Sequence, residues 1–245
     1  IRGLCKSYSD FTLKIIDLTL PGGSILGLIG ENGAGKTTTI KCILNLIRRD
    51  VGEITLLGYD NIREERLAKQ DIGLVRDECF FPHSLRPLDV GKILAPAYRE
   101  WDQKLFRDYL GKFGLPEKKL IKEFSRGMKM KLSLSAALAH HPRLLILDEA
   151  TAGLDPVVRD EILDEFLGFI QDEDHAILMS SHITSDLEKV ADYIAYIHQG
   201  EVVLSDAKDN ILDSYGRVGC TAAQLETIDR ADVLRTRKGA FGCEA

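Results

Sequence analysis

The segment Gly30–Thr37 constrains the fold of this chain more than any other part of the sequence. It fits the pattern G-x-x-x-x-G-K-[ST], in which glycines allow backbone N–H groups to turn inward around phosphate groups. An apolar run at 24–29 precedes it, which is typical of a short buried strand. Four apolar residues follow at the spacing of one helix face: Ile40, Ile43, Leu44 and Ile47. A strand, a glycine loop and a helix in this order predict a phosphate-binding loop at a helix N-terminus.

Within this loop, Lys36 is expected to reach the β- and γ-phosphates of a nucleotide, and Thr37 to ligate Mg²⁺. A chance glycine-rich turn is the alternative, and the strand and the helix on either side disfavour it. The remaining loop residues that we expect to contact the nucleotide are Gly30, Asn32, Gly33, Gly35 and Thr38.

The run LLILDE at 144–149 places two carboxylates at the end of an apolar strand. We expect Asp148 to hold Mg²⁺ through water, and Glu149 to polarise the water that attacks the nucleotide. Taken alone, an acidic strand terminus is the simpler interpretation. The phosphate loop upstream favours the functional one.

Lys36 and Asp148 are 112 positions apart, whereas small GTPases and nucleoside kinases usually place these elements closer together. The chain from about 84 to 140 has helical character. One helix is predicted to follow an N-cap at Asp102 and to stop near Gly114, and a second to cover 126–140. A helical subdomain is therefore predicted between the two motifs.

Apolar strands at 143–150 and 176–182, with a helical pattern at 161–170 between them, indicate βαβ units and a parallel sheet. The segment 193–205 is predicted to form a hairpin that turns at Gln199-Gly200. These elements together indicate an α/β fold.

A second helix N-terminus with anion-binding groups is predicted within EFSRGMKMKLSLSAALA, at 123–139. Ser125 and Gly127 offer a hydroxyl group and a backbone N–H there. A simple N-cap is the alternative, and it is favoured when the segment is considered alone. One chain hardly needs two phosphate-binding helix ends for one nucleotide, so a second subunit could supply this one.

Composition narrows the class of protein. The net charge of −6 over 245 residues disfavours a dedicated nucleic-acid binder, which is usually basic. Five scattered cysteines without a C-x-x-C pair indicate reduced thiols of an intracellular protein, rather than a disulfide frame or a zinc site. No run approaches the roughly 18–20 apolar residues of a membrane span, and no signal peptide is recognisable. His140 and His141, just before Pro142, are interpreted as stabilised by the negative end of a helix.

These motifs, in this order, resemble those of the ABC-type ATPases over residues 1–205. GENGAGKTT resembles the Walker A loop, LLILDE the Walker B strand, and FSRGM the signature loop, which is usually L-S-G-G-Q. ATAGLD at 150–155 resembles the D-loop, and SSH at 180–182 the segment of the switch histidine. Within the family, FSRGMKMKL and GLDPVVRDEIL are most similar to ATP-binding subunits of bacterial exporters.

The resemblance implies roles for particular catalytic residues. Lys36 would contact phosphate, Glu149 would be the general base, and His182 would contact the γ-phosphate. Asp148 and Thr37 would belong to the Mg²⁺ site.

The resemblance also implies contacts across a dimer and with adenine. Ser125 and Gly127 would contact ATP on the opposite protomer, and Asp155 would lie at the dimer seam. Tyr8 stands 28 positions before Lys36, where the family keeps an aromatic ring that stacks on adenine. The alternatives are an exposed strand tyrosine, or Phe11 in the stacking role.

The chain departs from the family pattern at several positions. IGLVRDE at 72–78 puts Asp77 where a glutamine is usual, with Arg76 in place of proline, and we expect Asp77 to belong to the metal site. Arg126 and Met128 replace Gly and Gln in the signature, and Ala150 replaces the usual proline after the catalytic glutamate.

The resemblance implies an α/β fold with three parts: a P-loop NTPase core containing a parallel sheet, an antiparallel β-subdomain that the 193–205 hairpin forms, and an inserted helical subdomain. The expected ATPase domain is 1–205, with the helical subdomain at about 78–141, and 206–245 is a tail. The implied function is Mg²⁺-dependent ATP hydrolysis that drives transport through separate transmembrane permease subunits. The ATPase would act at the cytoplasmic face of the membrane, with composite ATP sites in a head-to-tail dimer, most simply a homodimer.

Three other functions are weighed. An ABC ATPase acting on DNA or ribosomes usually carries long coiled coils or two ATPase halves, which 245 residues do not provide. A P-loop kinase would need an acceptor pocket and an arginine lid, and would leave FSRGM and SSH unexplained. A nucleotide-binding regulator without hydrolysis is disfavoured by Glu149 and His182.

Overall fold

The computed structural model describes residues 1–216, 218–225, 227, 236–239 and 242–244. The chain divides into two compact units, residues 1–206 and 207–245. The first unit carries every motif discussed above. The second unit contains helices and a small sheet of order β12-β14-β13. Its elements are α8 (Lys208–Ser214), β12 (Gly219–Cys220), α9 (Ala222–Leu225), β13 (Arg237–Gly239) and β14 (Gly242–Glu244).

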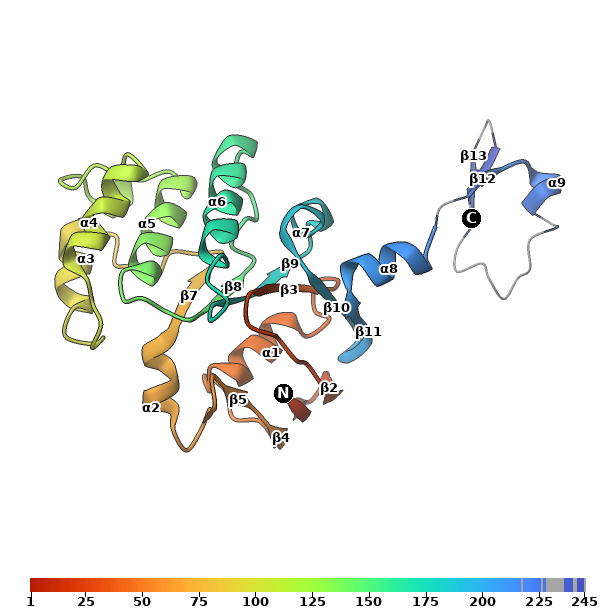
Figure 1. The fold of residues 1–245 in the computed structure, drawn as a ribbon, viewed down its shortest axis with the longest axis horizontal. Helices are drawn as coiled ribbons and strands as arrows, with labels where there is room; N and C mark the ends of the chain where they lie inside the picture. Colours follow the sequence, from red (N-terminus) through yellow and green to blue (C-terminus); the bar gives the residue numbers. More distant parts are fainter. Residues whose placement is uncertain (217, 226, 228–235, 240–241, 245) are drawn as a thin grey trace. The chain divides into compact units, whose positions relative to one another are not determined.

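A six-stranded sheet of order β11-β10-β3-β9-β8-β7 forms the centre of the first unit (Figure 1). The neighbouring pairs from β10 to β7 are all parallel. Strand LLILD is buried at every position, and its first four residues are apolar, because strands of a parallel sheet are buried on both faces. The strands are β3 (Ser24–Ile29), β7 (Ile72–Arg76), β8 (Leu144–Asp148), β9 (Ala176–Ser181), β10 (Tyr193–His198) and β11 (Glu201–Ala207).

Alternation along each strand divides the core into two clusters, one on each face of the sheet. Leu145 and Leu147 belong to the first cluster, and Leu144 and Ile146 to the second. The first cluster includes residues of five helices: α3 (Pro87–Leu94), α4 (Gln103–Lys112), α5 (Arg126–Leu138), α6 (Pro156–Phe169) and α7 (Thr184–Val190). Helices α3, α4 and α5 pack on one another and form the inserted arm (Figure 1).

The second cluster is covered by α1 (Lys36–Ile43) and by an antiparallel sheet of order β2-β1-β4. The strands of this sheet are β1 (Arg2–Ser7), β2 (Thr12–Ile16) and β4 (Val51–Glu53). Shorter elements follow β4 in the chain: β5 (Thr55–Leu56), β6 (Tyr59–Asp60), α2 (Glu65–Ala68) and the 3₁₀ helix Lys69–Asp71. A second 3₁₀ helix, Ile121–Glu123, lies between α4 and α5 in the chain.

Helix starts follow the capping residues in the sequence. The Asp102 side chain accepts a hydrogen bond from the backbone of Leu105 at 2.9 Å and begins α4, as predicted. Helix α6 begins at Pro156, five residues before its predicted start, because Asp155 caps it and proline suits the first helical turn. Helix α5 spans Arg126–Leu138, close to the 126–140 predicted for it.

The 193–205 hairpin is part of the main sheet, so its expected place in an antiparallel β-subdomain was wrong. Strand β10 pairs in parallel with β3 and buries Ala195 and Ile197 in the second core cluster. The turn has positive φ at both Gln199 and Gly200, which matches a two-residue hairpin loop. A side chain at Gly200 would put its Cβ 1.9 Å from the Thr12 carbonyl oxygen, which excludes any other residue there.

His140 is buried rather than a cation at a helix end, so that interpretation was wrong. It is 2% exposed, it stacks on Tyr98 with ring centroids 3.9 Å apart, and its Nε2 lies 3.1 Å from the Ile72 carbonyl oxygen. Burial lowers its pKa below the usual value and favours the neutral ring. Among the described residues, no helix combines the length and the apolar character that crossing a membrane requires.

Candidate functional site

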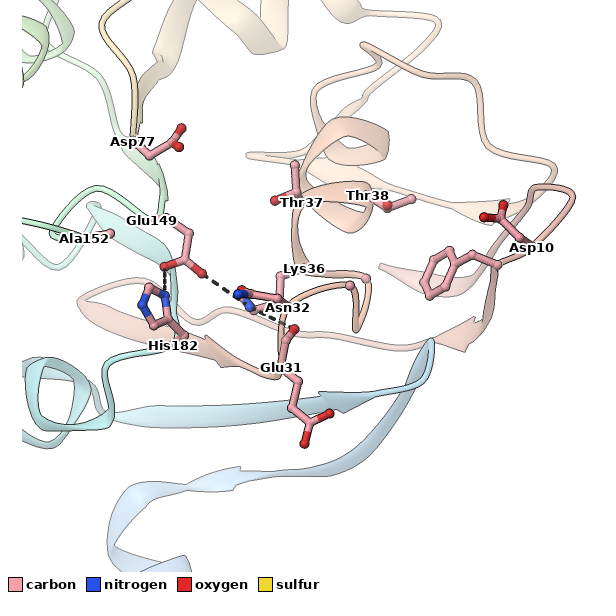
Figure 2. A pocket seen from close by; sticks show the side chains of 13 residues that line it. Asp10, Glu31, Asn32, Lys36, Thr37, Thr38, Asp77, Glu149, Ala152 and His182 are labelled. Carbon is pink, nitrogen blue, oxygen red and sulfur yellow. Dashed lines mark hydrogen bonds and ion pairs between the residues drawn. The ribbon is translucent and has the colours of Figure 1, made fainter.

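A cavity of about 600 Å³ lies at the carboxyl edge of the parallel sheet (Figure 2). Most of its walls come from the segments that follow β3, β7, β8 and β9, which is where open α/β sheets bind ligands, and Asp10 and Phe11 of the loop between β1 and β2 add to them. The lining residues are Asp10, Phe11, Glu31, Asn32, Gly33, Gly35, Lys36, Thr37, Thr38, Asp77, Glu149, Ala152 and His182.

The N-terminus of α1 opens into this cavity. Gly35 is its N-cap with φ of 119°, and within the described chain no side chain caps the helix. A Cβ at Gly35 would lie 2.5 Å from Leu13 Cδ2, so only glycine fits the turn. The first backbone N–H groups of α1 are therefore presented to an anion in the cavity.

Lys36 is folded back over the loop and is only 5% exposed. Its ammonium group donates to the carbonyl oxygens of Gly30 at 2.7 Å and Glu31 at 3.3 Å. It also lies 3.3 Å from Glu149 Oε1. The cation is thus held in the cavity by two carbonyl groups and one carboxylate.

Glu149 lies between Lys36 and His182 (Figure 2). Its Oε2 is 2.6 Å from His182 Nδ1, so the imidazole donates to one oxygen while Lys36 faces the other. Its backbone is held at a φ of 54°, a sparsely populated region that clusters at functional sites. Ser180 fixes this backbone, since the Glu149 N–H reaches its carbonyl oxygen at 3.2 Å and its Oγ at 3.1 Å.

Asp148 lies behind the cavity wall, 3% exposed, and is not one of the lining residues. Its Oδ1 accepts hydrogen bonds from Thr37 Oγ1 at 3.2 Å and Ser180 Oγ at 2.8 Å. A hydroxyl and a carboxylate are hard oxygen donors of the kind that Mg²⁺ takes together with substrate phosphates. The described residues hold no cluster of three or more His, Cys, Asp or Glu side chains that would bind a metal without a nucleotide.

Two predicted site residues, Asp77 and Tyr8, are placed differently from the residues described above. Asp77 is exposed at the cavity and makes none of the contacts drawn in Figure 2. Tyr8 is 47% exposed and does not line the cavity, whereas Phe11 does. The structure therefore favours Phe11 over Tyr8 as the residue that faces a bound base.

Ser125, Gly127 and Asp155 lie outside the cavity. Ser125 caps α5, accepting from the Met128 backbone at 3.2 Å, and Asp155 caps α6. A Cβ at Gly127 would lie 3.1 Å from Val158, so its small size also serves the packing of α5 on α6. Within one chain these residues do not reach the phosphate loop.

Sequence reasoning missed several residues of the site. Ser180, which contacts Asp148 and Glu149, lies directly beside Asp148 in the register of β9 and β8. Arg76 lies directly beside Asp148 on the other side, in β7. Aligning the ends of the strands predicted at 143–150 and 176–182 would have placed Ser180 next to the carboxylate, whereas Arg76 could not be placed because no strand was predicted at 72–76. The lining residues not anticipated are Asp10, Glu31 and Ala152.

Comparison with known proteins places the chain in a family. The ABC transporter family model matches residues 13–152. The lantibiotic transport ATP-binding protein SrtF of Streptococcus pyogenes is 34% identical over 212 residues, covering 85% of this chain and 90% of that protein. The linearmycin resistance ATP-binding protein LnrL of Bacillus subtilis is 37% identical over 227 residues, covering 90% and 72%.

Solved structures agree with this placement. The structure of an ATP-binding subunit of an ABC transporter has a TM-score of 0.79 at 26% identity, covering 86% of this chain and 90% of that chain. A dimeric ATP-binding cassette with ADP and phosphate has the same fold, with a TM-score of 0.74 at 20% identity, covering 84% and 97%. The chain belongs to the ABC transporter family, as an ATP-hydrolysing ATP-binding subunit that powers transport.

Proposed function

We propose that the cavity at the N-terminus of α1 binds Mg-ATP and that Glu149 directs its hydrolysis. The observation that carries this proposal is the chain of contacts from Lys36 to Glu149 to His182 beside an uncapped helix end. It brings together a cation for phosphate, a carboxylate base and a group that orients the base.

Phosphate binding rearranges the partners of Lys36. Its ammonium group is held at 3.3 Å from Glu149 Oε1, and a phosphate oxygen offers a stronger anionic partner at the same place. Lys36 then turns from the carboxylate toward the β- and γ-phosphates. This frees Oε1 of Glu149 for the attacking water.

The Mg²⁺ site is proposed at Thr37 Oγ1 and Asp148, with Asp77 at its outer edge. Bound there with the nucleotide, Mg²⁺ would neutralise charge on the phosphate oxygens. Ser180 keeps the Asp148 carboxylate in place by donating to Oδ1.

In the hydrolytic step, the water oxygen forms a bond to the γ-phosphorus while Glu149 accepts a proton from that water. The bond from the γ-phosphorus to the bridging oxygen breaks, and ADP and phosphate leave. His182 keeps the Glu149 carboxylate aimed at the cavity through its 2.6 Å contact with Oε2. Lys36 offsets the charge on the transferred group.

We propose that the second half of each ATP site comes from another copy of the chain in a head-to-tail dimer. Ser125 and Gly127 at the start of α5 would contact the γ-phosphate bound by the partner, and Asp155 would lie at the seam. Their position outside the chain's own cavity supports this assignment.

The proposed partners are transmembrane permease subunits at the cytoplasmic face of the membrane, and the proposed direction of transport is export. Relatives named for lantibiotic transport, linearmycin resistance and bacitracin transport support this direction. Co-purification of the chain with a multi-span protein from the same operon tests the partnership.

The ATPase mechanism is tested by phosphate release at saturating Mg-ATP. Glu149→Gln removes the base while keeping its shape, so turnover should fall by roughly 10²–10⁴-fold with ATP binding retained. Glu173→Gln, an exposed carboxylate outside the site, is the matched control and should leave turnover unchanged. Wild-type turnover in Glu149→Gln would contradict the assignment of the base.

A further inference from the structure

Arg76 lies beside the carboxylate of the proposed metal site, and the ATPase mechanism above does not use it. It ends β7 and pairs in register with Asp148 at the end of β8. Its Nε lies 3.7 Å from Asp148 Oδ2. The side chain is 25% exposed, whereas that of Asp148 is 4% exposed, so the guanidinium stands between a buried carboxylate and solvent.

The two oxygens of Asp148 have different partners. Oδ1 accepts from Thr37 and Ser180, both neutral hydroxyl groups. Oδ2 faces the guanidinium of Arg76. The negative charge of this buried carboxylate is therefore balanced from the side of β7, by a residue of the chain itself.

Arg76 is held in this position from its outer side as well. The Cζ atom of its guanidinium lies over the Phe80 ring, 4.7 Å from the ring centroid. Arginine favours such an arrangement because its flat group stacks on a ring while its edge faces a carboxylate. The other charged groups nearby are Asp77 and Glu78, both exposed, and Lys36 and Glu149 across the cavity.

We propose that Arg76 is a positioning residue that sets how strongly ATP binding depends on Mg²⁺. The inference rests on the proposed function of the cavity. Without metal, Arg76 offsets the charge of Asp148, which would otherwise repel the phosphate groups of free ATP. With metal, Arg76 and Mg²⁺ would both act on the Asp148 carboxylate, so the two cations would compete for its negative charge.

The loss of Arg76 should change the affinity for ATP in EDTA and the affinity for Mg-ATP differently, and both affinities can be measured. Removing the guanidinium weakens the binding of ATP in EDTA, because Asp148 is left uncompensated beside the phosphates. It does not weaken the binding of Mg-ATP, and it lowers the Mg²⁺ concentration needed for half-saturation. The ratio of the two dissociation constants therefore reports on Arg76 without any measurement of turnover.

The experiment is calorimetric titration with ATP in EDTA and with ATP in Mg²⁺. For Arg76→Gln, the ratio of the EDTA to the Mg²⁺ dissociation constant should rise about tenfold, which corresponds to about 1.4 kcal/mol. Arg76→Lys keeps the charge and should recover most of the wild-type ratio. Arg107→Gln, an exposed arginine on α4, changes the net charge equally and should leave the ratio unchanged.

A double-variant cycle shows whether Arg76 acts through Asp148. In an Asp148→Asn background, Arg76→Gln should leave the ratio unchanged, since the carboxylate that Arg76 compensates is gone. An equal rise in both backgrounds, or an unchanged ratio in Arg76→Gln alone, overturns the inference. Absence of ATP binding by the wild-type chain in both buffers would instead overturn the proposed function.

Discussion

The two helix N-termini that we propose as anion-binding sites, those of α1 and α5, are built differently. Helix α1 starts at Gly35 without a side-chain cap in the described chain, and its first turn lines the cavity. Helix α5 starts at Ser125, whose hydroxyl accepts from the Met128 backbone, and its first turn lies outside the cavity. An end that leaves its N–H groups open is suited to a ligand, whereas a capped end is stable by itself.

The residues around the two helix ends also differ: those around the start of α1 suit a ligand, and those around the start of α5 suit packing within the chain. The α1 end has the Lys36 ammonium folded over it, together with Glu149 and His182. The α5 end has Gly127 close to Val158 of α6, and neither Ser125 nor Gly127 lines the nucleotide cavity. We infer that the first end binds ATP within one chain and that the second acts only on the nucleotide of a partner.

The largest expected effect is at the α1 end. Lys36→Ala removes the cation of the phosphate loop, so ATP affinity should fall at least about 100-fold, or about 2.8 kcal/mol. Calorimetric titration with Mg-ATP measures it. Lys41→Ala, in the last turn of the same helix, removes the same charge and should bind ATP like the wild type. Tight ATP binding by Lys36→Ala would contradict the assignment of the α1 end as the ATP-binding end.

The C-terminal ends of α1 and α5 also differ, and this difference predicts how the stability of the fold depends on pH. Helix α1 has Lys41 in its last turn, whereas α5 has no basic residue there and is followed by buried His140. Burial lowers the pKa of His140, so below about pH 6.5 the unfolded chain binds a proton that the folded chain resists. Stability contributed by neutral His140 is complete above that pH and is lost as the pH falls toward the folded-state pKa.

Denaturant unfolding between pH 7.5 and 5.5 checks this. The contribution of one proton is at most about 1.4 kcal/mol per pH unit. His140→Gln should flatten the loss of stability on acidification, and His141→Gln, which is exposed, should not. Identical slopes in the wild type and His140→Gln would show that the buried ring does not set the acid sensitivity.

Ser125→Ala separates the structural role of the α5 end from its proposed role toward a partner. Loss of the cap should cost about 1 kcal/mol of unfolding free energy. ATP affinity of the monomeric chain should stay unchanged, since Ser125 lies outside the cavity. Ser133→Ala, on the same helix, is the control for removal of a hydroxyl. A fall in monomer ATP affinity would place Ser125 in its own chain's site.

The smallest expected effect concerns the adenine ring of an ATP molecule bound in the cavity at the start of α1. Phe11→Leu keeps apolar packing but removes an aromatic face, and should weaken ATP binding by about 1 kcal/mol. Tyr8→Leu should have no effect, because Tyr8 does not line the cavity. The reverse result, from the same titrations, would restore the stacking role to Tyr8.

Local features were predictable from the sequence. The phosphate loop, the cap at Asp102 and the apolar strands depend on neighbours within a few positions, and the structure has them where they were expected. The resemblance to ABC-type ATPases, confirmed by the comparisons, supplied the fold class.

Features that depend on register were not predictable by inspecting each segment alone. Arg76 and Ser180 flank Asp148 because three strands far apart in sequence align their ends. The hairpin that turns at Gln199 belongs to the main sheet because β10 pairs in parallel with β3. The sequence of the hairpin turn does not predict this pairing. The roles of the site residues themselves stay predictions.

The most direct test of the comparison is the assembly state of Glu149→Gln, which should hold ATP without hydrolysing it. In light scattering, this variant should be dimeric with Mg-ATP and monomeric with Mg-ADP, because the γ-phosphate joins the α1 end of one chain to the α5 end of the other. Adding Ser125→Ala should weaken the dimer by roughly 1.5–3 kcal/mol per site, as for a hydrogen bond to a charged group. A Glu149→Gln chain that binds Mg-ATP and stays monomeric would contradict the division of the site between two helix ends.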